Sequence, residues 1–555
     1  MKKKLVAGMM SAMMVASLLT GCGSSDSGSA GSTDSSSSAS TETGSEAAAG
    51  EADSSVTKTA YGEYTEENPY QLTFAYLEFY TQDEAARAAV QDAINAKTVP
   101  ELHIEVELLP LQPADYQSKV QMMLSGGDKL DVFPIQSTLA SSWINMGGIY
   151  DMSEFMDTAE GKAVENALGE SLAHAGTVNG ILYGFPANKE YVELGGLCMR
   201  ADICDELGIT EEYGLEKNKD EYDGTIYDWS VAGDIFAKVK EAYPDMIPLY
   251  LQGSSSQMNR FIHVDQLGDN FGVIDWESDP ESTTVVNKFE TDTYKNTITM
   301  LANWYDKGYI YKDAQTDTSG SATMMKAGNT FSYVTAIKPG FLVEAAAANG
   351  MDCYAIYFGT GVKSDRGTES VLFTGNACLY NTGIANNSED PEMAFKFISA
   401  LYSDSELMNL WQYGIQDVNY KLNDDGTIYF VDGEDGSNYK YHQNTGWSMG
   451  NQMISYVWSD GSKSADYWNK LQAHNDWGVV SKTFGFNWDS TQYSTQVTAL
   501  SNALSTYRAA LETGSVGAAN VESTLKELND ALYAAGLQDV MDAKQAQLDE
   551  WLAQQ

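Results

Sequence analysis

Aromatic residues flanked by amide, carboxylate or amine side chains recur along this 555-residue chain. An aromatic ring can pack against the C–H face of a neutral sugar, and polar neighbours can pair with the sugar hydroxyls once water has left. They indicate a site for a neutral, hydroxyl-rich solute, although Arg200 could equally pair with Asp202 or another acid. The residues that fit this chemistry are Glu78, Tyr80, Trp143, Asn188, Glu190, Tyr191, Arg200, Tyr333, Lys338, Asn376, Tyr413 and Gln416.

Packing in the core is the alternative role for every aromatic residue in this set, because most Trp and Tyr side chains are largely buried. For Trp143 and Tyr191, which are expected in loops, both roles stay open. Trp304 and Trp551 lie on apolar helical stripes and are expected in the core. Residues 447–488 carry a cluster of Trp. We favour a local core for this segment, since short hairpins need one, and the alternative is a platform for a larger glycan.

Motifs for catalysis are weak in this sequence. The five His residues are scattered, and neither H-E-x-x-H nor G-x-S-x-G occurs. Gly359-Thr360-Gly361 lacks the rest of a dinucleotide-binding fingerprint. With 78 Asp and Glu residues some carboxylate pair is inevitable, so a glycosidase pair cannot be recognised. We therefore expect a binding protein with no enzyme activity, no cofactor and no metal, and keep a surface glycan-degrading enzyme as the rival.

Leu19-Thr20-Gly21-Cys22 resembles a bacterial lipobox. Three Lys residues and an apolar run precede it, and that run is long enough for a signal peptide but too short to span a bilayer. Residues 1–21 are therefore expected to be removed, leaving Cys22 to carry the lipid. Residues 22–69 are expected to form an acylated, disordered tether, because residues 23–60 are mostly Ser, Gly, Ala, Thr and acids. A coil of this length spans about 35 Å.

The charge balance excludes some classes of partner. The formal charge is −45, and without Lys2, Lys3 and Lys4 the mature chain carries 30 Lys and Arg against 78 Asp and Glu, or −48. Nucleic acid is disfavoured because binding to phosphates needs a basic face. Past the N-terminal run no apolar stretch has transmembrane length, so lipid is the only expected anchor. Cys198 with Cys204, or Cys353 with Cys378, could form disulfides, but buried free thiols are at least as plausible.

Periodic apolar patterns predict two α/β units. Strands are expected at 72–76, 102–108 and 130–134, with helices at 83–95 and 115–125, an order that implies a parallel sheet. Ligands of such sheets bind beyond the carboxyl ends of the strands. A second unit is expected from strands at 197–200, 330–335 and 374–380 and helices at 201–207, 229–242, 298–307 and 392–402. Hairpins are expected within an aromatic insertion at 411–490, and three helices end the chain.

Several motifs in this order resemble those of extracellular solute-binding lipoproteins of carbohydrate-type ATP-binding-cassette (ABC) importers. They are residues 127–133, 183–191, 200–203, 333–340 and 413–420, and residues 484–488 with the following helices resemble a LipO-type C-terminal extension. The resemblance implies a two-lobe, type II periplasmic-binding-protein fold with the ligand cleft between the lobes. Lobe one would comprise 70–187 and about 374–405, and lobe two 188–373 and 406–555.

The resemblance also implies partners and a location. The expected partners are a carbohydrate, most simply an oligosaccharide, and the subunits of an ABC permease, with the protein itself a monomer. It would be anchored by lipid on the extracytoplasmic face of the cell membrane, in a Gram-positive bacterium. The rival within the same fold is a receptor for a peptide or another non-sugar solute.

Two departures from related sequences matter. Relatives often have Glu where this chain has Gln416. Many relatives carry a calcium loop after the helix that corresponds to residues 229–242, whereas residues 241–248 offer too few oxygen ligands here. We expect no calcium at this position. Residues 423–426 are a rival calcium candidate, but a hairpin turn explains them better.

Overall fold

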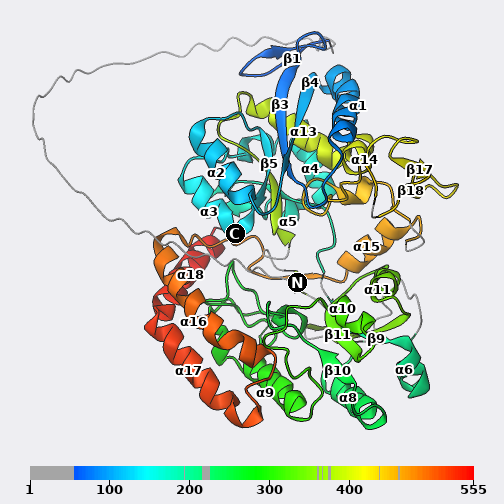
Figure 1. Ribbon diagram of the computed structural model, residues 1–555. Coiled ribbons are helices and arrows are strands. Elements are labelled where there is room, and N and C mark those ends of the chain that lie inside the picture. The colour runs from blue at the N-terminus through cyan, green and yellow to red at the C-terminus, as the bar shows by residue number, and fades with distance from the viewer. Residues whose placement is uncertain are drawn as a thin grey trace, which may run out of the picture. The chain divides into compact units, whose positions relative to one another are not determined.

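The computed structural model describes residues 55–192, 194–215, 226–279, 281–358, 362–364, 367–369, 371–372, 377–436, 438–459 and 463–554. Residues 54–555 form one compact unit. This unit contains two separate sheets, of five and four strands, each with its own hydrophobic core (Figure 1). The lobe containing the five-stranded sheet is called lobe one and the other lobe two. The signal peptide, Cys22 and Asn376 lie outside the described residues.

The sheet of lobe one has the strand order β4-β3-β5-β16-β8. Its first three strands are parallel, as the sequence predicts, whereas β16 joins antiparallel to both β5 and β8. The expected strand at 374–380 is therefore displaced toward the C-terminus, where β16 begins at Tyr380. The strands are β3 (Tyr70–Leu77), β4 (Ile104–Leu111), β5 (Val132–Gln136), β8 (Phe185–Pro186) and β16 (Tyr380–Ile384).

Helix boundaries in lobe one follow from local capping. Helix α1 begins after Asp83, whose carboxylate accepts a hydrogen bond from the Ala86 amide, and ends at His103 in the left-handed conformation. Helix α13 begins in the same way after Asp390. Buried Asp131 joins β5 to β3 by accepting bonds from the Tyr70 hydroxyl and the Thr73 amide. The helices are α1 (Glu84–Leu102), α2 (Tyr116–Gly126), α3 (Ser137–Asn145), α4 (Ala159–Leu168), α5 (Glu170–Ala173), α13 (Pro391–Ser403) and α14 (Ser405–Tyr413).

The sheet of lobe two has the order β10-β11-β9-β12, and β9 is antiparallel to both of its neighbours. Gly196 in β9 has no room for a side chain, because a Cβ would lie 2.4 Å from the Ile356 carbonyl oxygen. The strands are β9 (Leu194–Arg200), β10 (Ile247–Tyr250), β11 (Thr330–Ile337) and β12 (Cys353–Tyr357). The helices are α6 (Ala201–Glu206), α7 (Ile209–Tyr213), α8 (Ser230–Ala242), α9 (Asp292–Asp306), α10 (Ser321–Lys326) and α11 (Phe341–Asn349).

The predicted C-terminal helices are α16 (Ser494–Glu512), α17 (Val521–Ala534) and α18 (Leu537–Leu552), and their apolar faces belong to the core of lobe two. Fully buried Lys544 of α18 bonds to Asp269 at 2.8 Å. The segment before these helices also contacts lobe one, where the side-chain amide of Asn487 donates to the backbone carbonyls of Ala175 and Thr177, both at 3.0 Å. The extension is therefore attached to both lobes.

The chain after residue 405 differs from the expected division into lobes. Trp411 of α14, Tyr441 and Met449 lie in the same core as the sheet of lobe one. The first part of the aromatic insertion therefore packs on lobe one, although we expected 406–555 in lobe two. The hairpin expected at 423–426 is confirmed, since β17 (Tyr420–Leu422) pairs antiparallel with β18 (Ile428–Phe430).

Ordered structure also begins before the expected boundary at Tyr70. Strands β1 (Thr57–Lys58) and β2 (Glu63–Tyr64) form a hairpin, and the Thr57 hydroxyl bonds to His103 at 2.9 Å. The folded body thus includes at least part of the segment that we assigned to the tether.

The four described cysteines, Cys198, Cys204, Cys353 and Cys378, are free and buried, which matches the free-thiol alternative. Among the described helices, none combines the length and the apolar character needed to cross a membrane.

Candidate functional site

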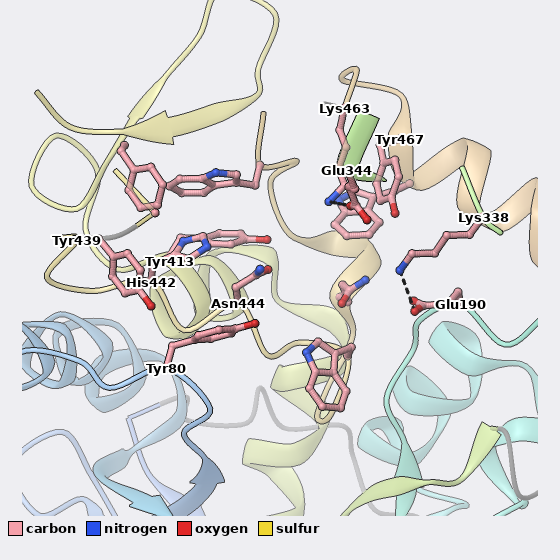
Figure 2. A pocket seen from close by; sticks show the side chains of 16 residues that line it. Tyr80, Glu190, Lys338, Glu344, Tyr413, Tyr439, His442, Asn444, Lys463 and Tyr467 are labelled. Carbon is pink, nitrogen blue, oxygen red and sulfur yellow. Dashed lines mark hydrogen bonds and ion pairs between the residues drawn. The ribbon is translucent and has the colours of Figure 1, made fainter. Parts of the chain in front are cut away.

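A cavity of about 420 Å³ lies where the two lobes and the aromatic insertion meet (Figure 2). Lobe one contributes Tyr80, lobe two contributes Lys338 and Glu344, and Glu190 comes from the segment that crosses between the lobes. The insertion supplies the remaining lining residues, Tyr413, Phe430, Gly436, Tyr439, His442, Asn444, Trp447, Gln452, Trp458, Lys463, Tyr467 and Trp468. The volume lies in the usual range for small-ligand sites.

One end of the cavity is a cluster of aromatic rings. The His442 ring stacks on Tyr413, and the centroid of Trp458 lies 4.1 Å from that of His442 and 4.5 Å from that of Phe430. Tyr80 is half exposed on the same side of the cavity, and its hydroxyl points toward the opposite, charged end (Figure 2). Such a wall offers flat apolar faces with hydroxyl and imidazole groups at their edges, as a sugar ring requires.

His442 is held by its backbone and has spare hydrogen-bonding capacity in its side chain. Its amide donates to the Gln82 side chain at 2.6 Å, while its buried Nδ1 has no partner among the described residues. Burial, with a smaller contribution from Lys463, lowers the pKa of His442 to about 4. The ring is therefore neutral at physiological pH and carries one donor and one acceptor.

The other end of the cavity holds two ion pairs. Lys338 Nζ lies 3.0 Å from Glu190 Oε1, and Lys463 Nζ lies 2.9 Å from Glu344 Oε1. Burial opposes ionisation of Glu190, but the charges of Lys338 and Lys189 outweigh it, so the pKa of Glu190 is lowered. Burial acts against the charge of Lys338 in the same way, yet Glu190 raises the pKa of Lys338. Both members of this pair are therefore charged at neutral pH.

The crossing segment that presents Glu190 is fixed by the insertion. The backbone amide of Asn188 donates to the Gly450 carbonyl at 2.8 Å. The backbone carbonyl of Asn188 accepts from the backbone amide of Gln452 at 3.1 Å. Asn475 of α15 (Tyr467–Asn475) accepts from the Tyr191 amide and donates to the Lys189 carbonyl, both at 2.8 Å. Glu190 is thus held on both sides by backbone contacts.

Four of the twelve predicted ligand residues line the cavity, namely Tyr80, Glu190, Lys338 and Tyr413. Two of these four, Glu190 and Lys338, are 148 residues apart in the sequence. The prediction that aromatic and polar residues at strand ends and crossing segments converge is thus consistent with the position of these four, and their contact with a ligand stays a proposal.

The other predicted residues that the structure describes lie outside the cavity. Glu78 bonds to Arg87 and Gln112, and Arg200 pairs with Asp202, the alternative that we left open. Trp143, Tyr191 and Tyr333 are buried in local hydrophobic clusters. Asn188 is buried and bonds to the Ala167 carbonyl, whereas Gln416 is exposed.

Trp143 illustrates why a position after a strand is a weak guide. It follows β5, but it lies on the inner face of α3 together with Ala140, against the rings of Tyr116 and Phe133. Only 1% of the residue is exposed. The i, i+3 spacing of Ala140 and Trp143 was the signal for a buried helical face.

The tryptophans at 447–488 divide between the two roles weighed for them. Trp488 belongs to the core of lobe two. Trp447, Trp458 and Trp468 are partly buried and line the cavity, and two of them also pack on small local cores. We favour the core role for this segment and keep a ligand platform as the alternative, and the position of these three residues in the cavity wall is consistent with that alternative. Sequence reasoning did not single out Glu344, His442 and Lys463. The density of aromatic residues in this segment was the available signal.

Comparisons with known proteins agree with this architecture. Residues 89–428 match the family described as bacterial extracellular solute-binding protein, and the chain therefore belongs to that family. Residues 482–553 match a domain of unknown function, DUF3502, which corresponds to the C-terminal extension. A two-lobe solute-binding protein is thus the class that the fold and the family define.

Individual relatives share low sequence identity with this chain. The chain is 23% identical over 449 residues to a carbohydrate ABC transporter substrate-binding protein of Streptococcus pneumoniae serotype 4, covering 79% of this chain and 82% of that protein. It shares its fold with the N-glycan transport solute binding protein NgtS from S. pneumoniae, with 20% identity, a TM-score of 0.69 and coverage of 87% and 99%. An HMO-binding, ABC-transporter-associated solute-binding protein from Bifidobacterium longum infantis gives 14% identity, a TM-score of 0.57 and coverage of 87% and 99%.

Proposed function

We propose that this protein captures a carbohydrate, most simply an oligosaccharide, and delivers it to an ABC permease without breaking a bond. The observation that carries the proposal is the cavity itself, in which an aromatic wall faces two ion pairs at the junction of the lobes. The relatives described above, a carbohydrate transporter subunit and glycan-binding proteins, support the same class of solute.

The proposed mechanism is hinge closure. Tyr80 belongs to lobe one, whereas Lys338 and Glu344 belong to lobe two, so a solute that contacts all three favours the closed form. The permease would then recognise the closed pair of lobe surfaces. The receptor would act as a monomer, and its affinity for solute would need no covalent chemistry.

The proposal includes a lipid anchor. Cys22 would carry the lipid and hold the receptor on the extracytoplasmic face of the membrane of a Gram-positive bacterium, close to its permease. Cys22→Ser should release the protein into the medium while the affinity of the folded lobes for solute stays unchanged. A loss of affinity in this variant would show that the anchor and the receptor are not separable.

A thermal-shift screen tests the choice of solute. The chain lacking residues 1–54 is exposed to mono- and oligosaccharides and to short peptides, and a ligand at 100 times its Kd should stabilise the protein by about 2.7 kcal/mol. Stabilisation by peptides but by no sugar would reject the carbohydrate assignment. Release of reducing ends from a bound glycan would reject a receptor that breaks no bond.

A further inference from the structure

The charged side chains that line one end of the cavity balance one another. Among the described lining residues, the Lys and Glu side chains are Lys338, Lys463, Glu190 and Glu344, and they form two opposite-charge pairs. His442 is neutral at this pH because burial lowers its pKa to about 4. Lys189 does not line the cavity, and its ammonium bonds to the Glu190 backbone carbonyl at 2.9 Å.

Each pair still has unused hydrogen-bonding capacity toward the cavity. An ammonium carries three donors and a carboxylate accepts through two oxygens, whereas the contact within each pair, at 3.0 Å and 2.9 Å, joins one nitrogen to one oxygen. A vicinal diol can donate to the carboxylate and accept from the ammonium at the same time. A carboxylate on the ligand cannot donate, and would have to compete with Glu190 or Glu344 for the same cation.

We propose that these two ion pairs select neutral glycan units and exclude sugars that carry a carboxylate, such as uronic acids. This inference rests on the proposed carbohydrate function and specifies its substrate class. An entering carboxylate would lose water, meet cations that already have partners and lie beside two anions. The chain's formal charge of −45 acts in the same direction at long range.

Substituting one or the other member of the Lys463–Glu344 pair should change the preference for neutral sugars in opposite directions. Structural damage would change it in the same direction, so the two substitutions distinguish the two causes. Glu344→Gln removes the anion and leaves Lys463 free to bind a ligand carboxylate. Lys463→Gln leaves the anion unpaired. Glu344 is 41% exposed and Lys463 is 23% exposed, so neither substitution empties a core position. Glu281→Gln, in the exposed Lys482–Glu281 pair outside the cavity, is the matched control.

The experiment compares each neutral oligosaccharide that the full mature chain binds with the same oligosaccharide oxidised at C6 to a uronate, by titration calorimetry. The neutral form should bind the wild type at least about tenfold more tightly, a step of about 1.4 kcal/mol. Glu344→Gln should reduce this ratio about tenfold and make uronate binding weaker in high salt, Lys463→Gln should increase the ratio, and Glu281→Gln should leave it unchanged.

Equal or tighter binding of the uronate by the wild type would overturn the charge selection while leaving the carbohydrate function intact. Shifts of the ratio in the same direction in both Glu344→Gln and Lys463→Gln would also overturn it, because a purely structural role predicts that result. If no neutral or oxidised glycan binds the wild type, the proposed function itself fails and the inference fails with it.

Discussion

Breaking the Lys338–Glu190 pair should destabilise the unliganded protein in a pH-dependent way. The Lys338 side chain is 30% exposed and that of Glu190 is 22% exposed, so the pair lies between a surface and a buried ion pair. Surface pairs contribute about 0–1 kcal/mol, and removing one partner of a fully buried pair costs about 3–5 kcal/mol. For Lys338→Met we expect a loss of about 2 kcal/mol at pH 7, because Glu190 is left without its nearest cation.

The sign of the pH dependence follows from the pKa of Glu190. Its folded pKa is lowered, although burial alone would raise it, because Lys338 and Lys189 stabilise the carboxylate. The contribution of the pair is therefore present above the unfolded pKa of about 4.3 and is lost as the pH falls through the folded pKa. The difference in free energy of unfolding between wild type and Lys338→Met should have its full value at pH 7 and should become smaller below about pH 4.

Urea unfolding followed by tryptophan fluorescence at pH 7 and at acid pH measures this difference. Lys482→Met is the control, because its partner Glu281 is 75% exposed and Lys482 is 52% exposed, so its effect should stay near zero. If Lys338→Met is no more destabilising than Lys482→Met, or if its effect does not depend on pH in the acid range, the Lys338–Glu190 pair does not stabilise the fold through the charge of Glu190.

Three further outcomes are expected. Trp458→Ala should weaken glycan binding about tenfold or more in titration calorimetry, because it removes a ring beside His442 and Phe430 in the cavity wall; unchanged affinity would remove this wall from the site. Trp143→Ala should cost about 3–5 kcal/mol in urea unfolding while leaving glycan affinity unchanged, since the ring lies in the core and not in the cavity. The thiols of Cys198, Cys204, Cys353 and Cys378 should resist Ellman's reagent in the folded protein and react in urea, because all four are buried and burial raises the pKa of Cys378 to about 12; rapid reaction of the native protein would contradict that burial.

The local elements of the fold could be predicted from the sequence because their signals are local. Asp83 caps α1 through a bond to a residue three positions away, and the apolar residues of β3 and β4 continue in nearly unbroken or alternating runs. The placement of β16 depends on pairing between Tyr380 and Gln136, and no local pattern encodes a pairing over that distance. The same limit explains why the first part of the insertion was assigned to lobe two.

Some residues of the site could likewise be predicted from the local sequence, whereas others depend on long-range contacts. Tyr80 and Glu190 could be proposed because they follow a strand end and lie in a crossing segment, and both line the cavity. Glu344 and Lys463 belong to no sequence motif. Only folding brings Lys463 Nζ to 2.9 Å from Glu344 Oε1. Trp143 and Tyr191 satisfied the residue-type criterion but are used for packing, because aromatic side chains serve cores as well as sites.

Most of the described cavity wall comes from a single segment of the chain. Of the sixteen residues that line the cavity, twelve lie in one stretch, residues 413–468, while the two sheets contribute only through the loops and the helix beside them. Substituting only the lining side chains of this stretch would change the ligand surface and keep the backbone contacts of Gly450 and Gln452 that hold the crossing segment. Substitutions confined to one segment are therefore enough to change most of the described cavity wall.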